Sequence, residues 1–192
     1  MASILSGKLR LKSQLVDLAS LVRNVTATFV ETAEAKNIQL AETISDEVPS
    51  NMFADGSRLK QVIAILLENA VKFTPEGGRI EIGLSLVISH SSLVEGQMTN
   101  DREPITNSIQ ITVSDTGSGI RPDFLPYAFD RFTQAEVPSR HTPGGVGIGG
   151  AIAHLVELHN GTIKVASEGE GRGATFIVKL PFNQPAQPNS DA

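Results

Sequence analysis

The stretch RLKQVIAILLENAVKF, from Arg58 to Phe73, has apolar residues at the spacing of an amphipathic helix. The residues from Pro75 to Gly78 follow at once and are typical of a turn that ends a helix. The sequence therefore predicts a helix from about Ser57 to Thr74. At about 100° per residue, its apolar side chains form one stripe that we expect to face a core: Leu59, Val62, Ile63, Leu66, Ala70 and Phe73.

Shorter elements are predicted on both sides of this helix. Asp17 is placed to cap a helix that runs to about Lys36. The alternating stretch that begins at Arg79 and the apolar stretch that ends at Val113 enclose a polar loop, residues 88–107, and so predict a hairpin. Strands are expected at 8–12, 38–44, 79–87, 109–113, 162–166 and 174–180, further helices at about 122–129 and 146–159, and an irregular stretch at 133–145.

The composition limits the classes of function. A chain of 192 residues with 40% hydrophobic content can form one compact domain with a buried core. It has no cysteine, which excludes disulfides, thiolate zinc sites and cysteine nucleophiles. The net charge of −5 and the scattered basic residues argue against nucleic acid as a partner. No apolar run is long enough for a signal peptide or a membrane span, so we expect a cytoplasmic segment without membrane contact, whether or not its parent protein is membrane-anchored.

A polar pair adjoins the apolar stripe of the central helix. Ile65, Asn69 and Lys72 share a second stripe, at spacings of four and three residues. An amide oxygen there can ligate a hard cation such as Mg²⁺, and an ammonium one turn away can meet a phosphate. The alternative is that both polar side chains are simply solvated, which is the usual state of such residues on a helix.

Asp115 ends a predicted apolar strand and precedes Thr116-Gly117-Ser118-Gly119. A carboxylate at a strand end can accept a hydrogen bond from the exocyclic amine of adenine, and glycines let a flat ring approach the backbone. An ordinary turn with an Asx hydrogen bond is the alternative interpretation.

A second glycine-rich run leads directly into a predicted helix. Six of the eight residues from Gly144 to Ala151 are Gly or Ala, so free N–H groups at the helix start can point at a phosphate. The alternative is a flexible loop with a small-residue packing surface. Taken together, the three motifs predict a site for a magnesium-bound nucleotide, ATP.

Five motifs in this order and spacing resemble those of the ATP-binding catalytic domain of sensor histidine kinases, hybrid kinases among them. This family lies in the wider superfamily of gyrase, the mismatch-repair ATPases and a heat-shock chaperone, and the resemblance covers nearly the whole chain. It implies an α/β fold, a two-layer sandwich of the Bergerat type in which a mixed, mostly antiparallel sheet packs on helices beneath a mobile lid. The motifs are the asparagine box at 58–75, the first glycine box at 115–119, the phenylalanine box at 129–132, the second glycine box at 145–149 and the last box at 173–176.

The resemblance also implies roles for individual residues. Asn69 would ligate Mg²⁺, Lys72 would contact phosphate and Asp115 would recognise adenine. Because Gln134 stands where some relatives have an arginine, Arg140 is the remaining candidate for a γ-phosphate contact. The other expected nucleotide-binding residues are Gly117 and Gly119, Thr175 on the adenine side, the lid hinges Gly145, Gly147 and Gly149, and Val146 and Ile148 between them.

The same resemblance predicts the domain limits and the partners. Residues 1–7 would be the remnant of a segment after dimerisation helices, 8–182 the ATP-binding domain and 183–192 a linker or tail. The expected partners are ATP, a histidine-bearing dimerisation domain of the same protein, and a response regulator or receiver domain.

Several departures from the family pattern bear on activity. Ile65 stands where these kinases usually have a second asparagine and gyrase-like ATPases have the glutamate that activates water, so autonomous ATP hydrolysis should be poor. Val146 and Gly150 replace a common threonine and leucine near the lid. None of the four histidines is followed by an acid, as a phosphoacceptor would be, and each is interpreted as solvated or packed at a helix end: His90, His141, His154 and His159.

Two hypotheses of function follow. The first is a kinase catalytic module that transfers the γ-phosphoryl group of ATP to a histidine outside this chain, with catalysis mainly by positioning and charge neutralisation. The second is a degenerate nucleotide-binding or docking module without kinase activity. The sequence favours the first, because Asn69, Lys72, Asp115 and the glycine hinges are all present.

Overall fold

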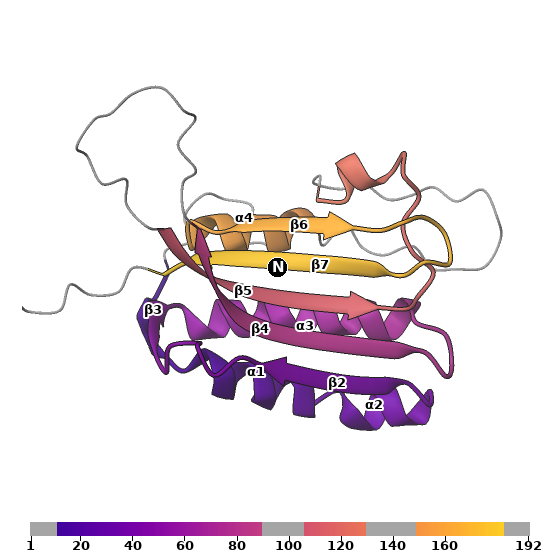
Figure 1. Cartoon of the computed structure of the whole chain (residues 1–192), viewed down its shortest axis with the longest axis horizontal. Coiled ribbons are helices and arrows are strands. Elements are labelled where there is room, and N and C mark those ends of the chain that lie inside the picture. Colours follow the sequence, from indigo (N-terminus) through magenta and orange to yellow (C-terminus); the bar gives the residue numbers. More distant parts are fainter. Residues whose placement is uncertain (1–10, 90–105, 130–148, 183–192) are drawn as a thin grey trace, which may run out of the picture.

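The computed structural model describes residues 11–89, 106–129 and 149–182. Within these residues, a five-stranded sheet forms one layer and helices cover one of its faces (Figure 1). The two-layer α/β sandwich that the sequence analysis expected is confirmed.

The sheet has the strand order β2-β4-β5-β7-β6. Only the pair of β2 and β4 is parallel, and the other three pairs are antiparallel, so the sheet is mixed and mostly antiparallel as expected. The predicted hairpin of β4 and β5 is present, with Ile82 opposite Val113. The bounds are β2 Gln39–Ile44, β4 Arg79–Ser89, β5 Thr106–Asp115, β6 Thr162–Ala166 and β7 Ala174–Pro181.

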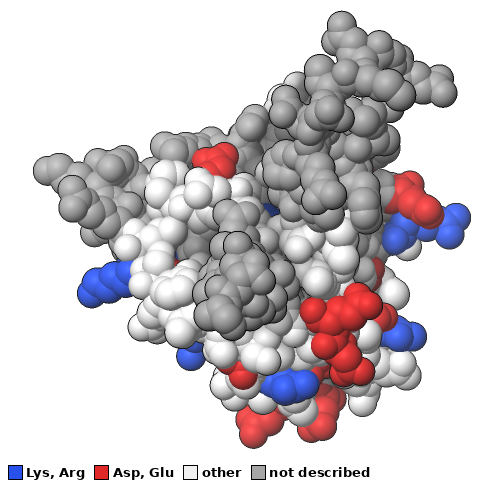
Figure 2. Space-filling model, turned by 60° about the vertical axis from the view of Figure 1, so that its left-hand side comes forward, with Lys and Arg blue, Asp and Glu red and all other residues white. Residues whose placement is uncertain are grey.

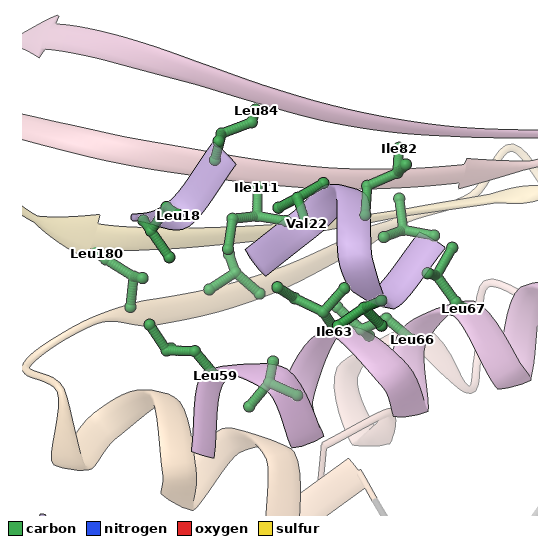
Figure 3. Close-up of a cluster of buried hydrophobic side chains, with 14 of the residues drawn as sticks. Leu18, Val22, Leu59, Ile63, Leu66, Leu67, Ile82, Leu84, Ile111 and Leu180 are labelled. Carbon is green, nitrogen blue, oxygen red and sulfur yellow. The ribbon is translucent and has the colours of Figure 1, made fainter. Parts of the chain in front are cut away.

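The core lies between this sheet and helix α3 (Gly56–Phe73), with α1 (Leu18–Ala27) and α4 (Gly149–Leu158) beside it (Figure 3). Alternate side chains of the strands point to the helices, and full burial of each Leu or Ile contributes about 1.5–3 kcal/mol. Fully buried residues of the two layers include Leu59, Ile63, Leu66, Ile80, Ile82, Ile109 and Ile111.

The predicted stripe on α3 is right for five residues and wrong for the sixth. Leu59, Val62, Ile63, Leu66 and Ala70 are buried, but the side chain of Phe73 is 43% exposed. The last turn of α3 lies against the loop after β5 instead of under the sheet, since the Phe73 carbonyl accepts a hydrogen bond from Ser118 N–H at 3.1 Å. The aromatic ring is therefore on the surface.

The single helix expected from Asp17 to Lys36 is two helices, α1 and α2 (Val30–Ala35). Asp17 does cap α1, because its Oδ1 accepts from Ser20 N–H at 3.0 Å. The break comes at Thr28, whose hydroxyl donates to the Val25 carbonyl at 2.7 Å and so competes with the helical ladder. The next N–H, of Phe29, bonds three residues back to Thr26. Apolar periodicity continues across the break, which is why the sequence pattern did not reveal it.

A two-stranded antiparallel ribbon, β1 (Gln14–Val16) and β3 (Met52–Ala54), lies beside the helices. The strand expected at 8–12 is wrong where it can be compared, because residues 11 and 12 belong to no strand and 8–10 lie outside the described residues. The Lys12 N–H bonds the Asp55 carboxylate at 2.9 Å instead of a neighbouring strand.

The two helices expected in the second half of the chain differ in how well they agree with the structure. The helix expected at 122–129 is a short 3₁₀ turn, η2 (Leu125–Tyr127), in which Pro126 restricts the backbone. The described part of the last helix begins at Gly149, and the predicted start at 146–148 lies outside the described residues. Of the helices in the described part of the chain, none combines the length and the apolar character of a membrane span.

Candidate functional site

The polar pair of the central helix occupies its last two turns. Asn69 is half-buried and Lys72 is exposed, and Ile65 packs partly against the core on the same side. The Lys72 ammonium lies over the Phe73 ring, 5.1 Å from its centroid. Such a contact is favourable by about 0.5–1 kcal/mol at an exposed site, so Phe73 and Lys72 form one small surface at the helix end.

The two oxygens of the Asp115 carboxylate have different surroundings. Asp115 is the last residue of β5, and its Oδ1 accepts from Gly117 N–H at 2.8 Å and Ala174 N–H at 3.3 Å. The Asx-type turn weighed in the sequence analysis is therefore present. Among the described residues, none hydrogen-bonds Oδ2. Burial raises the pKa of the Asp115 carboxyl, against the lowering effect of the two backbone N–H groups.

The loop after Asp115 touches the end of α3. A Cβ at Gly117 would lie 2.6 Å from the Phe73 carbonyl oxygen, so only glycine fits this approach. Gly119 has a φ of 68°, which L side chains rarely adopt. With the Ser118 hydrogen bond to Phe73, these contacts hold the Asp115 loop against the turn that carries Lys72.

Thr175 lies on β7, the strand that pairs with the end of β5 where Asp115 stands. Its hydroxyl is hydrogen-bonded to the Ser114 hydroxyl at 3.0 Å, and the adjacent pair in register is Asp115 and Ala174. The structure thus brings together Asp115, Gly117 and Thr175 at one end of β5 and β7. The contact of Thr175 with adenine stays a prediction.

A hollow of about 410 Å³ opens between the end of α3 and the loop that follows Asp115. This volume falls within the range of small-molecule sites. Two of the predicted residues, Lys72 and Gly117, line it, whereas Asn69 and Asp115 do not. The other lining residues include Lys36, Phe73, Thr74 and Ser118.

The sequence analysis missed two residues of this hollow. Phe73 was assigned to the core, but it is an exposed flat ring beside Lys72, and its place directly before the Thr74-Pro75 turn was the available signal. Lys36 donates from Nζ to the carbonyls of Val71 at 2.6 Å and Thr74 at 2.8 Å. No local pattern could reveal this contact, because 35 and 38 residues separate the partners.

Several predicted residues cannot be compared with the structure. Arg140, Gly145, Val146, Gly147 and Ile148 lie outside the described residues. Gly149 is the first residue of α4, and a Cβ there would collide with the Ala128 carbonyl.

No group of three or more metal-binding acid, histidine or cysteine side chains occurs in the part of the chain that the structure describes. A cation near Asn69 would therefore need oxygens from its ligand as well.

Two of the four histidines can be placed. His159 accepts from Asp55 N–H through Nε2 at 3.2 Å, and its Nδ1 lies 2.8 Å from the Leu155 carbonyl, so it is packed at the end of α4 as interpreted. His154 lies 4.0 Å from Glu157 on α4. His90 and His141 lie outside the described residues.

Figure 2 shows that Lys and Arg occur at separated places on the face it draws, with acidic side chains forming the larger group. This distribution is in keeping with the expectation that nucleic acid is not a partner, which stays a prediction.

Comparison with known proteins gives a family match and long alignments. Residues 54–184 match the family model described as "Histidine kinase-, DNA gyrase B-, and HSP90-like ATPase". The chain is 38% identical over 198 residues to hybrid signal transduction histidine kinase D of Dictyostelium discoideum, covering 95% of this chain and 13% of that protein. It is 37% identical over 172 residues to the sensor histidine kinase TmoS of Ectopseudomonas mendocina, covering 88% and 15%.

A solved structure extends the likeness to three dimensions. Full-length ShkA in complex with AMPPNP superimposes with a TM-score of 0.73 and 28% identity, over 97% of this chain and 35% of that one. The chain thus spans only a small part of the length of these relatives.

Proposed function

From the premise that this chain belongs to the family of histidine kinase-, DNA gyrase B- and HSP90-like ATPases, as a histidine kinase catalytic domain, we propose that it binds Mg·ATP and delivers the γ-phosphoryl group to a histidine outside the chain. Such a transfer needs little covalent chemistry from the protein and depends on positioning and charge neutralisation.

The observation that carries the proposal is the contact between the Asp115 loop and the last turn of α3. The hydrogen bond from Ser118 N–H to the Phe73 carbonyl keeps the loop that follows Asp115 beside the turn that carries Lys72, and both the loop and the turn line one hollow. On this basis Asp115 accepts from the exocyclic amine of adenine through Oδ2, the Phe73 ring stacks on the base, and Lys72 meets the phosphates.

The metal and the remaining contacts are assigned by resemblance. Asn69 ligates Mg²⁺ through its amide oxygen, together with phosphate oxygens. Thr175 contacts the adenine side, Arg140 the γ-phosphate, and the glycine loop at 145–149 covers the nucleotide.

The partners are assigned by resemblance to the family. The acceptor is a histidine of a dimerisation domain in the same protein, and in keeping with this neither His154 nor His159 lines the hollow. A response regulator or receiver domain then takes the phosphoryl group, and the word "hybrid" in the name of one relative supports a phosphorelay. The site of action is the cytoplasm, where ATP is available.

Calorimetric titration with a non-hydrolysable ATP analogue, with and without Mg²⁺, tests the proposal. We expect saturable binding that Mg²⁺ strengthens, and weaker binding of the corresponding GTP analogue, because Asp115 cannot pair with the carbonyl of guanine. Absence of binding in both conditions by a folded protein would contradict the proposal. Binding without phosphoryl transfer to the authentic dimerisation domain would instead support the degenerate module.

A further inference from the structure

Lys36 reaches from the end of α2 to the end of α3. It is the C-cap residue of α2 and is half-buried, and its ammonium donates to the carbonyls of Val71 and Thr74 at 2.6 and 2.8 Å. The last four carbonyls of a helix have no partner within it, and a cation near them also complements the helix dipole. Lys36 therefore satisfies two groups that α3 cannot satisfy itself.

The end of α3 has no closing turn of its own. Its C-cap, Thr74, is extended, with φ −81° and ψ 127°, as expected before Pro75. Within the helix, only the Ala70 carbonyl receives a bond from the cap, through Thr74 N–H at 2.9 Å. The Val71, Phe73 and Thr74 carbonyls are held from outside, the first and last by Lys36 and the middle one by Ser118.

The backbone of Lys36 and the residues next to it form hydrogen bonds with the turn that follows α3. The Lys36 carbonyl accepts from Gly77 N–H at 3.3 Å, and Asn37 Nδ2 donates to Glu76 at 2.8 Å. The N–H of Gln39 bonds the Gly78 carbonyl at 2.9 Å. Residues 36–39, between α2 and β2, thus hydrogen-bond the segment from Val71 to Gly78. Of these bonds, only those of the Lys36 ammonium reach the last helical turn of α3.

We propose that Lys36 is a positioning residue of the nucleotide site. Its ammonium fixes the last turn of α3, and this turn presents Lys72 and Phe73 to the hollow and its Phe73 carbonyl to the Ser118 loop. Without it, the turn frays as unsupported helix ends do, and ligand binding then has to order it. The inference rests on the proposed function, since it assigns Lys36 to the same site.

Lys36 acts here through the backbone and not by touching the ligand. Two of the three hydrogens on its ammonium are used by Val71 and Thr74. A substitution at Lys36 should therefore change nucleotide affinity mainly through Lys72 and Phe73, and this distinguishes it from a simple loss of positive charge in the hollow.

The test compares Lys36→Met, which keeps the length and removes the donors, with Lys60→Met as the matched control. Lys60 is an exposed lysine on α3, in no hydrogen bond or ion pair with a described residue. Affinity for Mg·AMPPNP is measured by calorimetry on the whole chain, well below the unfolding temperature of each variant. We expect Lys36→Met to weaken binding by roughly 5- to 30-fold, the scale of one or two lost charge-assisted hydrogen bonds, and Lys60→Met to leave it within about 2-fold.

Lys36→Arg tests for rescue, because a guanidinium can donate to two carbonyls. It should bind within about 3-fold of the parent if the bonds to Val71 and Thr74 are what matters. Lys36→Gln, which keeps an N–H donor on a shorter side chain, replaces Lys36→Met if that variant does not fold, with the same direction expected.

A double-mutant cycle with Lys72→Met separates positioning from independent contact. In the Lys72→Met background, Lys36→Met should cause a smaller loss of affinity than in the parent, because the Lys72 ammonium that Lys36 helps to position is already absent. Penalties that simply add, or parent affinity in Lys36→Met, would overturn the inference.

Hydrogen exchange on the ligand-free protein gives a readout that does not depend on nucleotide. The N–H groups of Thr74 and Ser118 should exchange faster in Lys36→Met than in the parent, while those of the β4–β5 hairpin stay unchanged. If the parent itself does not bind AMPPNP, the proposed function fails, and this exchange experiment still decides whether Lys36 holds the turn. Unchanged exchange at Thr74 and Ser118 would refute that role.

Discussion

The two oxygens of the Asp115 carboxylate give a test that separates binding from folding. Asp115→Asn keeps an oxygen for Gly117 and Ala174 N–H but replaces one acceptor by a donor. We expect ATP affinity to fall by about 1–3 kcal/mol, the cost of mispairing a buried polar group, with the fold intact by circular dichroism. Asp123→Asn, at an exposed acid paired with Arg121, is the control. Parent-like affinity in Asp115→Asn would remove Asp115 from the site.

The same side chain predicts a dependence on pH. Burial raises the pKa of Asp115 above its ordinary value of 3.8, against the effect of Gly117 and Ala174 N–H, so the ionised group disfavours the folded state at neutral pH. This penalty disappears as pH falls through the folded pKa and below the unfolded one. Asp115→Asn should therefore be at least as stable as the parent at pH 7. Its free energy of unfolding relative to that of the parent should be lower near pH 3 than at pH 7. Denaturant unfolding at the two pH values measures this.

An ionised Asp115 carboxylate accepts from the adenine amine more strongly than the protonated carboxyl does. Because burial raises the pKa of Asp115, the adenosine affinity of the parent should begin to fall at a higher pH than an unperturbed aspartate would cause, and the fall should be smaller in Asp115→Asn. Equal pH profiles for the two proteins would count against adenine recognition by this group.

Asn69 tests the metal. Asn69→Ala should remove most of the gain in ATP-analogue affinity that Mg²⁺ gives, while adenosine binding stays nearly unchanged, since the amide would contact only the metal. Glu68→Gln, one residue away and exposed, is the control. Calorimetry with and without Mg²⁺ measures both. A variant that responds to Mg²⁺ as the parent does would place the ion elsewhere.

Local motifs made some of these residues predictable and others not. Asn69, Lys72 and Asp115 are found in the sequence because each stands at a fixed spacing within a short pattern. Phe73 fits the apolar stripe equally well, and only the approach of the Gly117 loop takes it out of the core. Lys36 has no local signal, since its partners come from a distant helix end.

Among the elements, α3 is held in place by contacts at its N-terminus as well as by those at its C-terminus. Its N-cap, Asp55, is 6% exposed and accepts from Arg58 N–H and from Lys12 N–H, and its own N–H bonds His159. Burial alone would raise the pKa of the Asp55 carboxyl, but the bonds from Lys12 and Arg58 with the nearby charges hold it below 3.8. One residue thus joins the start of α3 to the chain before β1 and to the end of α4.

We expect Asp55→Ala to lower the free energy of unfolding by about 2–3 kcal/mol, from the lost cap and the unpaired N–H groups. Because its folded pKa is lowered, the stability that Asp55 contributes is present above pH 3.8 and is lost as pH falls through the folded pKa. The difference in the free energy of unfolding between Asp55→Ala and the parent should therefore become smaller at acid pH. Urea unfolding measures both, and Asp17→Ala, at the exposed cap of α1, should cost less.

Periodicity predicted elements with one clear face and failed where tertiary contacts decide. The strands β4, β5, β6 and β7 and the helix α3 alternate or repeat strongly, and their predicted positions are right to within a few residues. The ribbon of β1 and β3 is too short for a pattern, and the break between α1 and α2 depends on the Thr28 hydroxyl. The order of the five strands was not predicted, because it depends on pairings between segments that lie far apart in the sequence.

At the scale of the whole molecule, the proposed nucleotide site lies on a rigid frame, and among the described residues no histidine and no acidic side chain lines its hollow. The sheet and α3 form one continuous core, and the hollow lies at its edge, against the end of α3. Ile65, partly buried against that core, cannot activate water. On the proposed function, binding supplies the positioning, and the attacking group comes from a histidine outside the chain.

Incubated alone with labelled ATP, this chain should neither retain acid-labile phosphate nor hydrolyse ATP at a useful rate. On the proposed function, adding the dimerisation domain as a separate polypeptide should restore transfer, because that domain would provide the attacking imidazole while Asn69 and Lys72 would hold the ATP. Replacing the histidine of the added domain by alanine should abolish the transfer again, and Lys72→Met should reduce it without unfolding the protein. Autoradiography after gel separation and phosphate-release assays measure the two reactions. Robust phosphate release by the isolated chain would mean that water is activated by a group other than residue 65, and the kinase proposal would then give way to a self-sufficient ATPase.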